Sequence, residues 1–168
     1  MSIRGFTLIE LLTVVAVIAV LASIALPSMA SLIAEAQIKS EAHRLLAAVS
    51  TARGSAMGRR QSITLCPATV TETLLGECGG RFDQGFGVAT ALDGQWLRLY
   101  SASAPGIEIL NRAGSAPVTG SVTWDANGFG DRNMTLSICH RDSVHNWALI
   151  LNRVGRPRLA REWGHCPD

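Results

Sequence analysis

The first thirty residues of this chain contain an almost unbroken apolar segment, and this segment limits the folds that the chain can adopt. It covers residues 6–26 and is interrupted only by Thr7, Glu10, Thr13 and Ser23. At ~1.5 Å rise per residue, a helix of this length reaches about 31 Å and matches a bilayer core of ~30 Å. Arg4 precedes the segment and the next basic residue is Lys39, which favours a cytoplasmic N-terminus. The sequence therefore predicts a membrane-spanning helix followed by an exported remainder.

A secretory signal peptide is the alternative interpretation of this segment. Such a peptide has a shorter apolar region, with a small-x-small cleavage site behind it. The one comparable site, Ala22-Ser23-Ile24-Ala25, lies inside the apolar run. The length of the run and the position of this site both favour the membrane-spanning helix.

Glu10 places a carboxylate inside the apolar segment. Such a residue costs up to roughly 2.5–3.5 kcal/mol at the bilayer centre, less near an end of the span, and usually marks a site with a partner. The alternative is a charge that is tolerated near the membrane interface. Residues 4–12, Arg-Gly-Phe-Thr-Leu-Ile-Glu-Leu-Leu, resemble the leader junction of type IV prepilins and type II secretion pseudopilins. The resemblance implies that prepilin peptidase removes residues 1–5 by cleaving after Gly5 and that Phe6 is then N-methylated. It also implies that Glu10 pairs with the terminal amine of a neighbouring subunit during assembly, since both charges gain by pairing in hydrocarbon.

The helical pattern continues beyond the apolar segment. We expect a transmembrane and assembly helix over residues 6–27, a bend at Pro27, and an amphipathic continuation over residues 28–60. One apolar stripe runs along this continuation with spacings of three and four residues: Ile38, Ala42, Leu45, Val49, Ala52 and Ala56. The charged residues off the stripe are Glu35, Lys39, Glu41, Arg44 and Arg53. Gly54 and Gly58 weaken the last turns, so the helix should end near residues 54–60.

From residue 61 onward the hydrophobic period changes to that of strands. Side chains alternate at residues 62–65, 96–100, 122–124 and 136–138, and residues 148–151 form a short apolar run. Turn dipeptides separate these segments: Gly79-Gly80, Asp93-Gly94, Pro105-Gly106, Asn127-Gly128 and Gly130-Asp131. The sequence therefore predicts an α+β fold, in which a long N-terminal helix packs on an antiparallel β-sheet head of residues 61–168.

Four cysteines lie in the predicted exported part: Cys66, Cys78, Cys139 and Cys166. An even number of cysteines in an oxidising compartment is typical of two disulfides, for which three pairings are possible. We favour the nearest-neighbour pairing, because Cys66–Cys78 closes a short loop and Cys139–Cys166 fastens the C-terminus to a strand. A metal site built from Cys139-His140 and His165-Cys166 is the alternative, but the spacing is unusual for zinc and oxidation removes thiolates.

Enzymatic function finds little support in the sequence. No nucleophile or carboxylate arrangement accompanies the histidines, which are His43, His140, His145 and His165. The glycines at 76, 79 and 80 do not match a phosphate-binding loop between a strand and a helix. We therefore predict a chain that is not an enzyme and has no catalytic residues, metal or cofactor.

Several segments of the head carry a second resemblance. Residues 59–66, 78–86, 122–128 and 136–139 resemble the GspH/FimT family of minor pilins and minor pseudopilins. The closing stretch 148–158 is most similar to FimT members, in which a Gly-Arg-x-Arg motif is associated with DNA binding in natural transformation. The resemblance places this motif on Gly155, Arg156 and Arg158.

The residues around the motif suit contact with phosphates. Four arginines lie within nine residues, opposed only by Glu162: Arg153, Arg156, Arg158 and Arg161. Guanidinium groups fit phosphate oxygens, Gly155 allows a turn, and Pro157 keeps the segment extended. Four phosphate contacts would give a salt slope of about −3.6 and binding independent of sequence. Stacking of Trp163 on an unpaired base is one interpretation, but a role in the core or in packing on the disulfide is favoured.

Two functions follow from these features. In the first, a minor pilin at the pilus tip binds extracellular DNA for natural transformation through its C-terminal arginines. In the second, a purely structural subunit primes a type IV pilus or a type II secretion pseudopilus. Both place the protein in the inner membrane with its head in the periplasm, and then in the pilus or pseudopilus at the cell surface. The expected partners are other pilins through the N-terminal helix, prepilin peptidase, and, in the first function, DNA.

Overall fold

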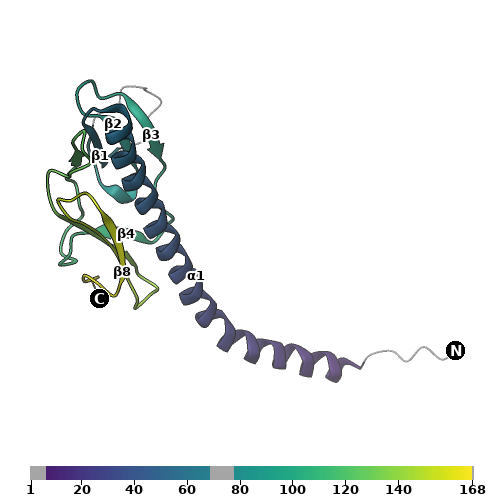
Figure 1. The fold of residues 1–168 in the computed structure, drawn as a ribbon. Coiled ribbons are helices and arrows are strands. Elements are labelled where there is room, and N and C mark those ends of the chain that lie inside the picture. Colours follow the sequence, from purple (N-terminus) through teal and green to yellow (C-terminus); the bar gives the residue numbers. More distant parts are fainter. Residues whose placement is uncertain (1–6, 69–77, 168) are drawn as a thin grey trace.

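A computed structural model describes residues 7–68 and 78–167, without the side chains of residues 24–28. One long helix, α1 (Leu8–Arg59), is followed by a head of short strands. The C-terminal part of α1 packs on the head, while its N-terminal part extends away from it (Figure 1). The predicted leader, with the cleavage site at Gly5 and Phe6, lies outside the described residues.

Helix α1 has well-defined ends. Thr7 caps its N-terminus, where the hydroxyl accepts a hydrogen bond from the backbone N–H of Glu10 at 3.3 Å. Arg60 adopts the left-handed conformation and ends the helix, inside the range predicted from Gly54 and Gly58. The helix changes direction within its N-terminal half (Figure 1), as expected from the proline in that region.

The N-terminal part of α1 exposes its large apolar side chains, among them Leu8 at 77% and Ile9 at 67%. Among the described residues, no helix combines the length and the hydropathy of a membrane span. The span predicted from the sequence, residues 6–26, includes one residue outside the described ranges, Phe6, and three residues whose side chains are not described, 24–26.

The strands of the head form two antiparallel sheets. The first sheet has the order β3-β2-β1-β5, and its strands are β1 (Ile63–Pro67), β2 (Phe86–Thr90), β3 (Trp96–Tyr100) and β5 (Val122–Trp124). The second has the order β4-β6-β7-β8, with β4 (Ile107–Leu110), β6 (Met134–His140), β7 (Trp147–Leu151) and β8 (Pro157–Arg161). A short 3-10 helix, η1 (Phe82–Gln84), precedes β2.

Sequence periodicity identified five of these strands and missed β2, β4 and β8. Strand β2 is buried along its whole length, so it shows no alternation between apolar and polar residues. Strand β4 has only four residues after a turn. Strand β8 begins at Pro157, a position that tolerates proline, and carries two exposed arginines that mask its apolar residues. The division of the strands between two sheets also had no signal in the sequence.

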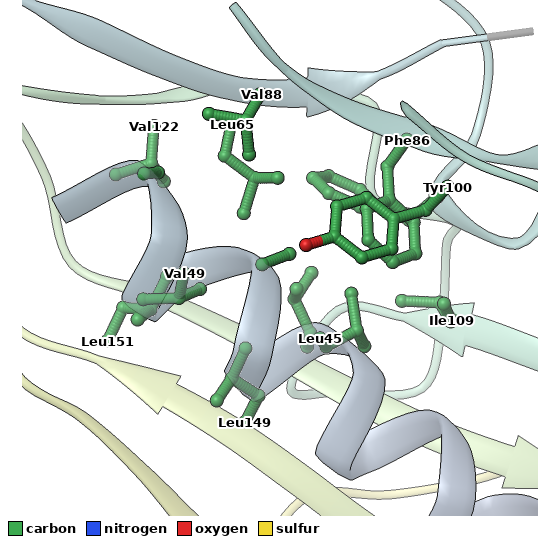
Figure 2. Close-up of a cluster of buried hydrophobic side chains, with 14 of the residues drawn as sticks. Leu45, Val49, Leu65, Phe86, Val88, Tyr100, Ile109, Val122, Leu149 and Leu151 are labelled. Atoms are coloured by element: carbon green, nitrogen blue, oxygen red, sulfur yellow. The ribbon is translucent and has the colours of Figure 1, made fainter. Parts of the chain in front are cut away.

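The hydrophobic core lies between α1 and the two sheets. Leu45 and Val49 of α1 lie between Leu65 of the first sheet and Leu149 and Leu151 of the second (Figure 2). All six residues of the predicted stripe are at most 1% exposed. Burial of each large apolar side chain contributes roughly 1.5–3 kcal/mol, so this stripe is what holds the two sheets to one helix.

Glu41 differs from its sequence prediction. It was placed off the apolar stripe, yet its side chain is buried, with the residue only 6% exposed. The carboxylate accepts hydrogen bonds from Arg44 at 2.8 Å and from the Ser103 hydroxyl at 3.0 Å. The loop after β3 covers this side of the helix, and the sequence pattern could not indicate that cover. The hydrogen bond from Ser103 therefore joins α1 to the loop after β3.

Both predicted disulfides are present. Cys66 pairs with Cys78, and Cys139 pairs with Cys166. The second disulfide fastens the C-terminal segment to β6, as the nearest-neighbour pairing predicted. The alternative metal site loses both of its thiolates to this bond.

Candidate functional site

The β7–β8 hairpin positions the arginine-rich segment. Asn152 organises its turn: its carbonyl accepts a hydrogen bond from the Gly155 N–H at 2.8 Å, and its side chain accepts one from the Arg156 N–H at 3.2 Å. Gly155 has a φ of 76°, in the left-handed region that favours glycine. The turn therefore presents Arg156 and Arg158 in a defined order at the start of β8.

The turn rests against the loop after β5, which is also hydrogen-bonded to helix α1. A Cβ at Gly155 would collide with the carbonyl oxygen of Gly128 and lie 3.1 Å from the Trp124 indole. The same Gly128 carbonyl accepts a hydrogen bond from the Arg53 guanidinium at 3.1 Å. Three segments distant in sequence thus meet around Gly128: the helix end, the loop after β5 and the arginine-rich turn.

Arg153 is tied to the neighbouring loop. Its backbone N–H donates to the Asn133 side chain at 2.9 Å, and its guanidinium donates to the Asp131 carbonyl at 3.4 Å. Its own carbonyl accepts a hydrogen bond from the Gly130 N–H at 3.0 Å. These hydrogen bonds fix the backbone of Arg153 beside the turn, while its side chain remains exposed.

Arg156 and Arg158 are two exposed cations of the segment. Within the described part of the chain, neither guanidinium lies within 4.0 Å of a carboxylate oxygen. Positive charges without an acidic neighbour are available to an anionic ligand.

Arg161 is separated from the other arginines. Residues three apart on a strand point to opposite faces, so Arg158 and Arg161 lie on different sides of β8. Arg161 is paired with Trp147 of β7, and its guanidinium lies 4.0 Å from Glu35 of α1. The four predicted arginines therefore do not form one cluster, because Arg161 faces the helix.

Trp163 lies beside two arginines. The guanidinium carbons of Arg112 and Arg158 lie 4.9 and 5.3 Å from the centroid of its ring. Contacts of this kind between a cation and a ring contribute ~0.5–1 kcal/mol at exposed sites. Trp163 remains 38% exposed, so it is not a core residue. Sequence reasoning missed Arg112, which lies 46 positions before Arg158 and belongs to no motif.

The histidines of the head contact acidic side chains or line a surface depression. His145 contacts Glu162 at 2.9 Å and Glu35 at 3.7 Å, and thereby joins the C-terminal segment to α1. His140 and His165 line a broad depression of about 1050 Å³ beside the Cys139–Cys166 disulfide. In the two described ranges, no three side chains of histidine, cysteine, aspartate or glutamate are placed to hold a metal ion.

Comparison with known proteins identifies two family signatures. Residues 41–155 match the family model described as type II transport protein GspH. Residues 1–26 match the prokaryotic N-terminal methylation motif. No curated protein matches the chain.

Solved structures give the same picture at the level of the fold. Two crystal forms of the type IV minor pilin FimU from Pseudomonas aeruginosa are similar to this chain, each at 21% identity. The first covers 75% of this chain and 90% of FimU with a TM-score of 0.58. The second covers 73% of this chain and 91% of FimU with a TM-score of 0.55.

Proposed function

This chain belongs to the GspH family and is a minor type IV pilin or pseudopilin; on that premise we propose that its head also binds DNA through the β7–β8 hairpin. The observation that carries the proposal is the exposure of Arg156 and Arg158, without acidic partners among the described residues, at the start of the edge strand β8. Planar guanidinium groups bind phosphate oxygens through paired hydrogen bonds, and they do so whatever the base sequence. The ligand would be extracellular DNA, and the process natural transformation.

The proposed path of the protein begins in the inner membrane. Prepilin peptidase cleaves after Gly5, the terminal amine of Phe6 is methylated, and the N-terminal helix anchors the subunit with its head in the periplasm. The subunit then joins the pilus by packing this helix among those of other pilins. The exposed apolar side chains of the N-terminal half of α1 support this path, since other helices would cover them.

A structural role without DNA binding is the second candidate. Arg161 and His145 both contact Glu35, so part of the basic segment serves to hold the head on its own helix. Under this candidate, Arg156 and Arg158 would contact an acidic neighbour in a pilus or a type II secretion pseudopilus. The two candidates differ in whether the isolated protein binds DNA.

The Arg156→Ala/Arg158→Ala variant tests DNA binding. We expect its affinity for a fluorescent duplex to fall at least tenfold at about 50 mM salt, because two phosphate contacts are lost. The slope of log K against log salt should become less steep by about 1.8. Fluorescence anisotropy of the full-length protein in a non-ionic detergent measures both quantities.

The matched control for this experiment removes two arginines elsewhere. Arg98→Ala/Arg141→Ala takes the same charge from exposed positions on β3 and the loop after β6. It should retain the wild-type affinity. If wild-type protein does not bind DNA at low salt, or if both double variants bind alike, the structural role becomes the better candidate.

Glu10 tests the role of the N-terminal helix in assembly. Replacing it by glutamine removes the carboxylate that would pair with a neighbour's terminal amine, so recovery in sheared pili should fall about tenfold or more. Glu108→Gln, an exposed carboxylate on β4, is the control and should assemble normally. Equal recovery of the two variants would exclude the assembly role of Glu10.

A further inference from the structure

On the outer face of the second sheet, two arginines lie over the ring of one tryptophan. We call this group the Trp163 clamp: Arg112, Arg158 and Trp163. Arg158 is paired with Ile150 of β7. The two neighbours of Ile150 in this strand, Leu149 and Leu151, face the core. Because side chains alternate across a strand, Arg158 points away from α1. Arg112 follows the end of β4 at the opposite edge of the same sheet. The two arginines approach each other only through Trp163, which lies between the edges.

The C-terminal segment that carries Trp163 is fastened on both sides of the ring. Beyond it, the His165 N–H donates to the Arg112 carbonyl at 3.0 Å, and the Cys139–Cys166 disulfide ties the segment to β6. Before it, the Glu162 N–H donates to the Asn146 carbonyl at 3.0 Å. The Trp163 ring is therefore held in place while remaining partly exposed, and it can orient the guanidinium groups that stack on it.

The electrostatics of the clamp are unbalanced. Among the described side chains, no carboxylate oxygen lies within 4.0 Å of either guanidinium. Each arginine has an acidic residue four positions away in sequence: Glu108 for Arg112, and Glu162 for Arg158. Glu162 is engaged with His145 at 2.9 Å. Two exposed positive charges held around one ring repel each other unless an anion lies between or above them. Such a pair suits a phosphodiester backbone.

We propose that Arg112 is a further phosphate-contacting residue for DNA, and that Trp163 is a positioning residue that directs Arg112 and Arg158 towards the same strand. This inference rests on the proposed DNA binding of the β7–β8 hairpin and extends that surface across the outer face of the second sheet. Because guanidinium groups already stack on the indole, Trp163 contacts no base. Binding through the clamp therefore depends on the phosphates alone, and duplex and single strand lose affinity equally when it is removed.

The first test is the Arg112→Ala variant of the full-length protein in non-ionic detergent. Its affinity for duplex DNA should fall about threefold or more at about 50 mM salt, with a salt slope less steep by about 0.9. The control is Arg98→Ala, because Arg98 is also exposed and also stacks on a ring, at 5.2 Å from the centroid of Tyr100, but in the first sheet. This control should bind as the wild type does.

The second test is the pair Trp163→Leu and Trp163→Phe. Neither changes the charge, so a loss of affinity reports on the orientation of the arginines. We expect Trp163→Leu to weaken binding of duplex and single strand by the same factor, and Trp163→Phe to restore part of it, since phenylalanine also accepts a cation on its face. Unchanged melting temperatures would show that the fold is intact.

The outcomes separate this inference from the proposed function. Wild-type protein that fails to bind DNA overturns both. Wild-type binding that is lost with Arg156→Ala/Arg158→Ala but retained by Arg112→Ala overturns the clamp alone. A Trp163→Leu variant that loses affinity only for single-stranded DNA would show that the ring stacks on bases, which also overturns the clamp.

Discussion

Replacing both Cys139 and Cys166 by serine is expected to lower the free energy of unfolding by about 3.5 kcal/mol. The disulfide closes a loop with a sequence separation of 27 residues, and the cost reflects the chain entropy that the unfolded state regains without it. This disulfide also anchors the C-terminal segment that carries Trp163 to β6. Affinity for DNA should therefore fall together with stability, even at temperatures where the variant remains folded. Chemical denaturation and anisotropy on the same preparation measure the two effects.

The other disulfide provides the control. Cys66–Cys78 closes a shorter loop, with a separation of 12 residues, so the Cys66→Ser/Cys78→Ser variant should lose about 2.8 kcal/mol. This disulfide starts from β1 in the first sheet, away from the arginines, and its loss should leave the affinity for DNA unchanged. If the two double variants lose affinity for DNA equally, the loss comes from general destabilisation. The proposal that the C-terminal segment positions the DNA-binding arginines is then wrong.

Substituting Gly155 by alanine is expected to destabilise the protein by about 3 kcal/mol. Part of this cost, roughly 1–2 kcal/mol, comes from placing an L-residue at a φ of 76°. The rest comes from the collision of the new methyl group with the Gly128 carbonyl, a backbone atom that cannot move aside without shifting the loop after β5. The displaced turn carries Arg156, so the affinity for DNA should also fall.

Gly94 allows the two contributions to be separated. Its φ is 67°, close to that of Gly155, but a Cβ there meets nothing within 4 Å. Its hairpin is braced by a hydrogen bond from Thr90 to Asp93, which lowers the pKa of Asp93. Gly94→Ala should therefore cost only about 1–2 kcal/mol and leave DNA binding unchanged. Similar unfolding free energies for the two variants would contradict the close packing of the turn on Gly128.

Features that depend on local sequence were predictable. The apolar stripe of α1 repeats at the helical period, so its burial followed from spacing alone. The end of α1 followed from two glycines with poor helix propensity. The pairing of Cys139 with Cys166 was favoured because the nearest cysteines were the simplest partners. Each of these inferences needed only residues within about thirty positions of one another.

The candidate site combines predictable and unpredictable parts. The sequence by itself determined a chain of pilin type, with a long N-terminal helix, a β-rich head and an arginine-rich segment near its end. Tertiary structure alone decided which arginines act together. The pleat of β8 turned Arg161 towards Glu35 and left Arg158 outside, and the disulfide-bound C-terminus brought Trp163 between Arg158 and Arg112. The physical reason is that strand pairing and chain crossing bring distant residues into contact, and a pattern of neighbouring residues does not record those contacts.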